Sequence, residues 1–526
     1  MPLPAGGDVV WPPTHPVVAT AQADWDAWYS SDPDRLTERY ENRGVRELPE
    51  NRPSQFRGGV WGRLARWFWG NPTAPGEKRD KLHVPLAGDI ARTSSELLFA
   101  EPPKLVIGHA ATQDRLEELL ATGLHPTLLE GGEVCSAIGG AYLRVVWDQD
   151  VSDRPWIDTV PADMAVPTFS YGRLRSVIFW RTLEHDGKTV LRHLESHDRG
   201  RITHGLYEGT ATTLGRPIPL TEHADTAPLA ALVDSNSGID TGAPDHLTAS
   251  HAPNVRPARA WRNIPEARGL GQSDYQGIEG LMDAVDETYS SWMRDVQDGK
   301  SRIIVAQSML ESLGPGQGAA WNEERRIYTG LNMLPRPGDP APITDVQFAI
   351  RVEEHSRTCA ELVEQAVRQA GYSPSTFGET GDGAAVTATE IKARERRSMT
   401  TRARKALYWG PAIADVVEAL LAVEAGPRFR VPGLGVDRPQ VEFQDSVSES
   451  PKEIAETVEF LKRAEAASRE TLVRMVHPDW KDEQVAAEVA KIEDETAMAD
   501  PTLTGGEGFP PPGQQQGEGG ANSEEE

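Results

Sequence analysis

Gly271-Gln272-Ser273-Asp274-Tyr275 opens the most informative part of the chain, which extends to residue 425. After this opening, apolar residues recur at helical spacing and acidic residues take the opposite side, which predicts a long amphipathic helix. Ser273 and Gln276 have the spacing of a capping box, and Gly299 ends the pattern. The apolar positions of this helix are Ile278, Leu281, Met282, Val285, Tyr289, Trp292, Met293 and Val296.

A second long helix is predicted from about Asp345 to Gly371, after another capping-box pattern at Thr344 and Gln347. The segment between the two helices indicates strands and turns, because Arg302–Val305 and Arg326–Tyr328 are short apolar runs among glycines and prolines. One face of the second helix carries Phe348, Val352, Cys359, Leu362, Val363 and Ala366.

A glycine-rich segment at residues 372–385 follows the second helix and has no periodicity, which predicts a mobile loop. A third helix begins after the capping-box pattern Thr387–Glu390. Its later turns are apolar, and Pro411 removes one backbone donor, so we expect a kink just before it. Its early turns carry the basic residues Lys392, Arg394, Arg396, Arg397, Arg402, Arg404 and Lys405.

The order and spacing of these segments resemble the portal proteins of tailed bacteriophages, particularly the siphovirus-type portals. The resemblance covers roughly residues 20–498 and rests on the order and spacing of the segments. Further matching segments are His83–Leu86, Leu97–Pro103, Gly271–Asp274, Thr387–Ile391 and Val441–Phe443 before a helical C-terminal region.

The resemblance, together with the local patterns, implies an α+β portal fold. Its central parts would be two stem helices (271–299 and 345–371), a clip with a little β structure between them (300–344) and a tunnel loop (372–386). The remaining parts would be a flexible N-terminus (1–20), an α/β wing (21–270) with a surface excursion at about 209–258, a kinked wing helix with the strand after it (387–445), a helical crown (446–498) and a disordered acidic tail (499–526).

Composition agrees with this interpretation. The 526 residues carry a formal net charge of −26, so the surface as a whole should repel nucleic acid, as suits a conduit through which DNA must slide. Only Cys135 and Cys359 occur, which favours a reducing compartment over a disulfide framework. The chain shows neither a basic and then apolar leader nor an apolar run of ~20 residues, so we expect a soluble protein without membrane association.

The tunnel loop is the expected DNA-contacting site, because the resemblance places it in the channel. Glu379 and Asp382 make tight phosphate binding there unfavourable, so the contact should be steric and brief. The residues of this channel-loop set are Tyr372, Ser375, Thr376, Phe377, Gly378, Glu379, Gly381 and Asp382.

Two further groups of residues are candidates for contacts between protomers. Trp292, Met293 and Val352 are expected to pack neighbouring stems together, and the alternative is an ordinary helical bundle in a monomer. The basic run of the third helix favours a solvated or intersubunit face paired with acidic surfaces, and DNA contact is its alternative. The basic candidates are Lys392, Arg394, Arg396 and Arg397.

The search for enzyme chemistry assigns no catalytic, cofactor-binding or metal-binding residue. There is no Gly-x-x-x-x-Gly-Lys-Ser/Thr phosphate loop, and Gly314–Gly318 is better explained as a turn than as a nucleotide site. His193 and His197 bracket Glu195 on a predicted strand and share one face. Without a third ligand at zinc spacing, a solvated strand face explains them better than a metal site.

We therefore predict a portal protein that forms a ring, dodecameric by resemblance, at one capsid vertex, where DNA is packaged and ejected. The resemblance implies assembly in the host bacterial cytoplasm and contacts with the large terminase, a head-completion or adaptor protein, the scaffold and the major capsid protein. The alternatives are a metal-dependent nuclease and a monomeric head adaptor. DNA cleavage with Mg²⁺ or Mn²⁺ would favour the first, and mass in solution would separate the second.

Overall fold

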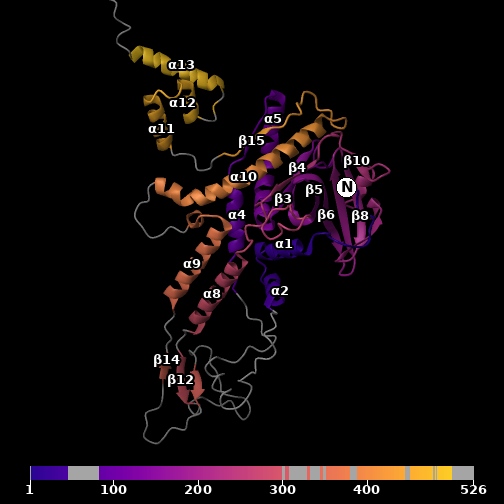
Figure 1. Cartoon of the computed structure of the whole chain (residues 1–526), viewed down its shortest axis with the longest axis vertical. Coiled ribbons are helices and arrows are strands. Elements are labelled where there is room, and N and C mark those ends of the chain that lie inside the picture. The colour runs from indigo at the N-terminus through magenta and orange to yellow at the C-terminus, as the bar shows by residue number, and fades with distance from the viewer. Residues whose placement is uncertain are drawn as a thin grey trace, which may run out of the picture. The chain divides into compact units, whose positions relative to one another are not determined.

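The computed structural model describes residues 2–44, 82–298, 302–306, 328–331, 344–346, 351–378, 388–444, 451–477, 480 and 482–499. These residues fall into two compact units, Met1–Gln444 and Asp445–Glu526. The first unit combines several antiparallel sheets with long helices, so the α+β class is confirmed (Figure 1).

A seven-stranded antiparallel sheet in the order β1-β9-β8-β7-β6-β5, with β10 paired to β8, is the largest sheet of the first unit. A hairpin turn at Asp186 and Gly187 joins β6 to β7, where the Asp186 N–H donates to Thr189 O and Gly187 has a φ of +86°. The strands are β1 (Gly7–Val10), β5 (Ala165–Ser170), β6 (Arg173–His185), β7 (Val190–Asp198), β8 (Arg201–Gly209), β9 (Thr213–Ile218) and β10 (Gly238–Asp240).

Two segments are more regular than the sequence predicts. Residues 1–20, expected to be flexible, contain β1 and the start of α1 (Pro16–Tyr29), and Trp11 is buried against Trp180. Residues 209–258, expected to be a surface excursion, supply β9, β10 and β11 (Ala249–Pro253). β1, β10 and β11 pair with strands that are distant in the sequence, which local periodicity does not reveal.

A second sheet, β11-β3-β4, and the helices around it form the interior next to the large sheet. Trp25 and Trp28 of α1 are buried there. The elements are α2 (Pro33–Gly44), α4 (Leu86–Phe99), α5 (Ala110–Leu119), η1 (Leu120–Leu124), α6 (His125–Ile138), β3 (Gly140–Val146), β4 (Trp156–Pro161), η2 (Ala162–Met164), η3 (Leu220–Glu222) and α7 (Ala227–Ala230), with β2 (Lys104–Val106) and β15 (Gln440–Glu442) paired to each other.

Helix α10 (Ala388–Ala425) crosses this interior and continues past Pro411, and it bends along its length (Figure 1). Trp409, Ile413 and Leu420 are fully buried in the core. Glu395–Ala425 is long and apolar enough to cross a membrane, but 61% of its apolar window is buried inside the protein. Its apolar character is therefore accounted for by core packing.

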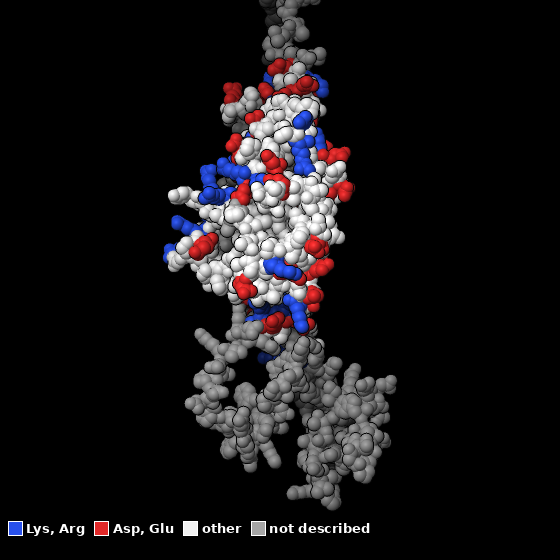
Figure 2. Space-filling model, turned by 90° about the vertical axis from the view of Figure 1, so that its right-hand side faces the viewer, with Lys and Arg blue, Asp and Glu red and all other residues white. Residues whose placement is uncertain are grey.

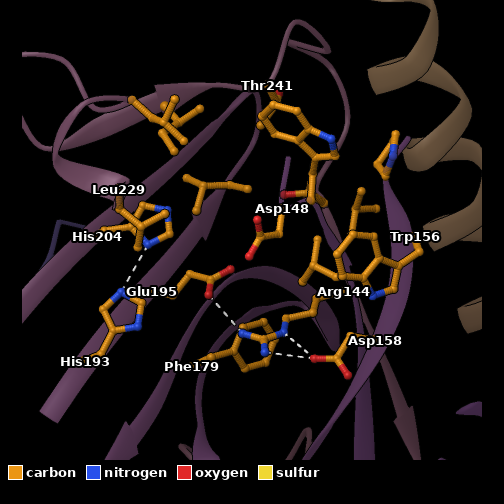
Figure 3. A pocket seen from close by; sticks show the side chains of 18 of the residues that line it. Arg144, Asp148, Trp156, Asp158, Phe179, His193, Glu195, His204, Leu229 and Thr241 are labelled. Atoms are coloured by element: carbon orange, nitrogen blue, oxygen red, sulfur yellow. Dashed lines mark hydrogen bonds and ion pairs between the residues drawn. The ribbon is translucent and has the colours of Figure 1, made fainter. Parts of the chain in front are cut away.

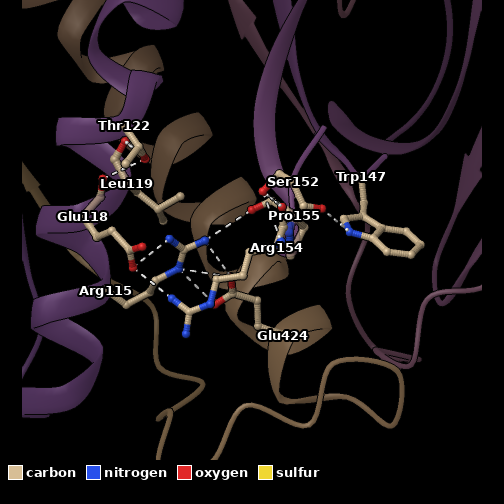
Figure 4. A network of polar contacts seen from close by, with 9 residues as sticks. All are labelled: Arg115, Glu118, Leu119, Thr122, Trp147, Ser152, Arg154, Pro155 and Glu424. Carbon is tan, nitrogen blue, oxygen red and sulfur yellow. Dashed lines mark hydrogen bonds and ion pairs between the residues drawn. The ribbon is translucent and has the colours of Figure 1, made fainter. Parts of the chain in front are cut away.

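A buried ion pair joins α5 to the end of α10 (Figure 4). Arg115 Nη2 donates to Glu424 Oε1 at 2.6 Å and to Pro155 O at 3.3 Å, and its Nη1 lies 3.0 Å from Glu118 Oε2. Both side chains of the pair are buried, so the hydrogen bonds replace the water that each charge loses.

Helices α8 (Glu279–Asp298) and α9 (Val352–Ala370) pack against each other (Figure 1). Both begin later than predicted. The first capping box is absent, because Ser273 Oγ accepts from Tyr275 N–H and donates to Ser136 O. At the second predicted capping box, Thr344–Val346 form a strand instead of a helix start. Phe348 lies outside the described residues.

The segment between α8 and α9 contains β12 (Arg302–Ala306), β13 (Tyr328–Leu331) and β14 (Thr344–Val346). β12 pairs in parallel with β13 and antiparallel with β14, which confirms the predicted first strand; residues 326–327 lie outside the described part of the chain.

The second unit is helical where it is described, as predicted, with α11 (Pro451–Arg463), α12 (Arg469–Val476) and α13 (Asp482–Ala499). Ser468 caps α12, and His477 stacks on Trp480 with ring centroids 3.8 Å apart. The predicted tail beyond residue 499 lies outside the described residues.

Candidate stem and loop junction

Polar and aromatic contacts hold α8 against α9. Asp295 on α8 accepts from Arg351 Nη2 at 3.0 Å and pairs with His355 Nε2 at 2.9 Å. These hydrogen bonds from His355 and Arg351 lower the pKa of Asp295. The His355 ring also stacks on Trp292, with the two planes 8° apart. The two helices are therefore joined at the end that lies next to the β12 sheet segment.

The three predicted stem-packing residues differ in exposure. Trp292 and Met293 are half-buried, and Trp292 already contacts His355 and Tyr289 of its own chain. Val352 is 49% exposed, and Val296 is also exposed. Val352 is thus the member of the predicted set with the largest exposed fraction.

Asp274, in the turn before α8, is the centre of a buried polar network. Its carboxylate accepts from Ser136 Oγ at 2.6 Å, Asn254 Nδ2 at 2.8 Å and Tyr372 OH at 2.7 Å, and it forms an ion pair with Lys405 Nζ. The Asp274 side chain has no exposed surface. Four separate parts of the fold therefore meet at one carboxylate.

Lys405 of α10 uses its three N–H donors inside this network. Besides Asp274, its Nζ lies 2.6 Å from Ser94 Oγ on α4 and 2.9 Å from Tyr372 OH. Its side chain is 2% exposed. Because every donor has a partner, the buried ammonium group is compensated.

Tyr372 is therefore not available for the predicted contact with DNA, and this part of the prediction is wrong. The side chain is 1% exposed, and burial together with the charge of Asp274 raises the pKa of its hydroxyl well above the usual value. The glycine-rich composition of the segment conceals an aromatic residue that belongs to the core.

Some of the other predicted channel-loop residues contact the body of the protein, and others lie outside the described residues. Residues Pro374–Phe377 form a 3-10 turn (η5), with Thr376 Oγ1 2.8 Å from Ser398 Oγ and Phe377 packed on the core. Ser375 is half-buried, and Gly378 is exposed with a φ of +80°. Glu379, Gly381 and Asp382 lie outside the described residues.

The basic residues of α10 also differ in their surroundings. Arg396 and Arg397 are exposed, whereas the side chains of Lys392 and Arg394 lie outside the described residues. Two of the other basic residues face inward: Arg402 donates to Leu97 O, and Lys405 joins the Asp274 network. Arg404 is exposed and donates to Arg256 O. Sequence reasoning missed this internal role, although the apolar spacing of the following turns was a signal that α10 enters the core.

Charges on one face of the molecule are interspersed. Figure 2 shows acidic and basic side chains scattered around a largely uncharged surface, without a continuous basic stripe in this view. The described residues on this face do not form the positive groove typical of a duplex-binding surface.

A cavity of about 910 Å³ lies where β7 and β8 meet β3 and β4 (Figure 3). Arg144 pairs there with Asp158 at 2.8 Å and Glu195 at 2.9 Å, and His193 Nε2 lies 3.2 Å from His204 Nδ1. Burial disfavours the charge on Glu195, but Arg144 and the neighbouring His197 outweigh it and hold its pKa well below the usual value.

The His193, Glu195 and His197 pattern is thus used for internal pairing. His197 pairs with Glu195 at 2.6 Å and with Thr248 at 2.8 Å, while His193 pairs with His204. His193 and His197 are buried, so the predicted solvated strand face is wrong. No group of three candidate metal ligands is found among the residues that the structure describes.

A sequence model of the phage portal proteins, SPP1 Gp6-like, matches residues 71–502 of the chain. The match defines the class: portal proteins are structural, non-enzymatic components of the virion. The chain belongs to the SPP1 Gp6-like phage portal proteins. This confirms the resemblance seen in the sequence, and nothing in the comparisons supports a nuclease or a monomeric adaptor.

Three solved structures are similar at low identity. The virion of a native gene transfer agent particle matches with a TM-score of 0.40 and 14% identity, covering 79% of this chain and 99% of that chain. The neck of the native particle, computed with C12 symmetry, gives 0.39 and 14%, covering 79% and 92%. The neck of the empty particle, computed with C6 symmetry, gives 0.40 and 13%, covering 79% and 99%. No curated protein is a significant match.

Proposed function

We propose that this portal protein is one protomer of a closed ring at a capsid vertex and that double-stranded DNA passes through the ring during packaging and ejection. The observation that carries the proposal is the α8–α9 pair of a portal-family chain, which leaves Val352 and Val296 exposed in the single protomer. Apolar surface left open on a paired helix is removed from water when a second copy packs on it.

The proposed parts follow the chain order. Helices α8 and α9 are the stem, the β12–β13–β14 sheet belongs to the clip, and the sheets with α10 form the wing. The helices α11, α12 and α13 form the crown. The gene transfer agent necks computed with C12 and C6 symmetry fit a ring of twelve protomers, which is the ring size that we propose.

The proposed DNA contact lies in the segment that begins at Gly378. Glu379, Gly381 and Asp382 belong to it, and the anchored residues Thr376 and Phe377 hold its start against the body. Two carboxylates in so short a segment oppose phosphate binding. This contact therefore restricts the movement of DNA sterically.

Arg396 and Arg397 are proposed to contact an acidic surface of the neighbouring protomer rather than DNA, and Lys392 and Arg394 precede them on the same helix. The chain has 80 acidic against 54 basic residues, so acidic partners for exposed arginines are plentiful. Such exposed ion pairs select the orientation of two protomers more than they stabilise the ring.

The proposed location is the virion, after assembly in the cytoplasm of the host bacterium. The proposed partners are the large terminase, a head-completion or adaptor protein, the scaffold and the major capsid protein. No enzymatic step is part of this proposal.

The ring is tested with two variants that each add one glutamate to α9. Val352→Glu places the charge on the exposed apolar position, and Gln365→Glu places it at an exposed position more than three turns further along the helix. A glutamate in the first turn is favourable for the helix itself, so Val352→Glu should leave the protomer folded. Burying it between protomers is costly.

Mass photometry with negative-stain imaging should show rings for the natural chain and for Gln365→Glu, and mainly smaller species for Val352→Glu. If the natural chain remains monomeric at high protein concentration and across salt, the ring proposal fails. If Val352→Glu forms rings as readily as the natural chain, the ring contact does not use this end of α9.

A further inference from the structure

The start of the proposed channel loop is tied to one face of α10. Ser398 Oγ accepts from Ser373 N–H at 2.9 Å and lies 2.8 Å from Thr376 Oγ1. Thr401 Oγ1 donates to Gly371 O at 2.6 Å. Lys405, four residues further along the helix, contacts Tyr372 OH at 2.9 Å.

These three residues of α10 have the spacing of neighbours on a helix surface, since positions three and four residues apart face the same way. Ser398 and Lys405 are buried, and Thr401 is half-buried. Their partners run from Gly371 to Thr376, just before the segment that begins at Gly378. We name this set of contacts the clasp.

The clasp is continuous with the Asp274 network. Tyr372 bonds to Lys405 and to Asp274, and Asp274 lies in the turn that leads into α8. The start of the loop is therefore fixed to both α10 and the base of the stem by groups that water does not reach.

We propose that Ser398 and Thr401 are positioning residues that hold the start of the loop on α10, so that the loop is presented to DNA from a rigid base. The functional half of this inference rests on the proposed role of the loop as the DNA contact. The structural claim, that Ser398 and Thr401 hold the start of the loop on α10, does not depend on that role and has its own measurement.

Ser398→Ala combined with Thr401→Val removes the three hydroxyl contacts of the clasp and leaves the Asp274–Lys405 ion pair in place. Thr401→Ser alone keeps a hydroxyl that can reach Gly371 O. The matched control is Thr400→Val, which removes an exposed hydroxyl that bonds only to Arg396 O of the same helix among the contacts described.

Hydrogen–deuterium exchange of the full chain is measured for peptides that cover residues 372–378 and, as a reference, β7. In the double variant, exchange at 372–378 should accelerate about tenfold or more, because the Ser373 N–H loses its acceptor and the other two contacts that hold this part of the chain on α10 are also lost. Exchange in β7 should stay constant, and Thr401→Ser and Thr400→Val should match the natural chain. Unchanged exchange at 372–378, or equal acceleration in β7, would overturn the clasp.

The same variants are then assembled into particles, and the DNA content per particle is measured. The double variant should form rings and lose packaged DNA, whereas Thr401→Ser and Thr400→Val should not. Accelerated exchange with normal DNA content would show that the clasp exists but does not position the loop for DNA. If the loop itself does not contact DNA, particles in which the loop is deleted should keep their full DNA content, and this is a separate measurement.

Discussion

Asp274 illustrates how one buried residue can connect segments that are far apart in the sequence. Its partners Ser136, Tyr372 and Lys405 lie 138, 98 and 131 positions away. In a water-free interior, removal of a single partner leaves a buried group unsatisfied, at a cost of about 1–3 kcal/mol, and of more when the group is charged. The network therefore tolerates few substitutions, and it restricts how α10 and α8 can be arranged.

Buried histidines should make the stability of the first unit depend on pH. Burial lowers the pKa of His193 to about 4 and that of His251 to about 3. Each ring is therefore neutral in the folded chain, while the unfolded chain takes up the proton near pH 6.5. The stabilisation is complete above about pH 6.5 and is lost as the pH falls toward the folded values.

His251→Gln should reduce this pH dependence. Between about pH 7 and about pH 5, the free energy of unfolding of the natural chain should fall by roughly 2 kcal/mol for each such histidine, and glutamine removes one of them. Urea denaturation at the two pH values measures the difference. The exposed His185→Gln is the control and should behave as the natural chain. An undiminished fall for His251→Gln would show that His251 does not contribute.

At the scale of helices and strands, elements with a repeated sequence pattern could be predicted, whereas the residues at which two of the helices begin could not. The apolar spacing predicts α8, α9 and α10, because each pattern repeats over several turns. The helix starts at Ser273 and Thr344 were mispredicted. A capping-box pattern has the same letters whether its side chains bond locally or, like Ser273, to Ser136.

The candidate site was predictable only in outline for the same reason. The position of the loop between two helices follows from local sequence. The burial of Tyr372 and Lys405 depends on Asp274, which lies too far from them in the sequence for a local pattern to relate the three residues. Burial of a lysine is also uncommon, so composition favoured the exposed interpretation.

Deletion of residues 379–386 tests the loop as an element. The deletion leaves Gly378 and the clasp in place, so ring formation should be the same as for the natural chain. Particles should contain less DNA, because the proposed contact is removed. Replacement of the same residues by a Gly/Ser segment of equal length is the control for spacing. Full DNA content in particles with the deletion would exclude this segment as the channel contact.

At the scale of the whole molecule, the two units divide the chain at Gln444. The two main hydrophobic clusters lie entirely within the first unit, and the buried Arg115–Glu424 pair joins α5 to the end of α10. The first unit therefore contains the contacts that stabilise its own interior.

A chain that ends at Gln444 should fold, and its thermal midpoint should lie within a few degrees of the first transition of the full chain. A chain that ends at Leu420 lacks Glu424 and leaves Arg115 buried without its partner, which costs about 3–5 kcal/mol in addition to lost packing. Circular dichroism on heating compares the two. Loss of cooperative unfolding in the chain that ends at Gln444 would show that the first unit needs the second.

The Arg115–Glu424 pair also has a consequence for synthesis on the ribosome. The two residues are 309 positions apart, so at about 5–20 residues per second Glu424 is made roughly 15–60 s after Arg115. Until then α5 and the strands next to it lack the helix that covers them, and their apolar surfaces are open to other nascent chains. Slower translation of the later part of the gene should therefore lower the yield of soluble protomer without any change in its amino-acid sequence.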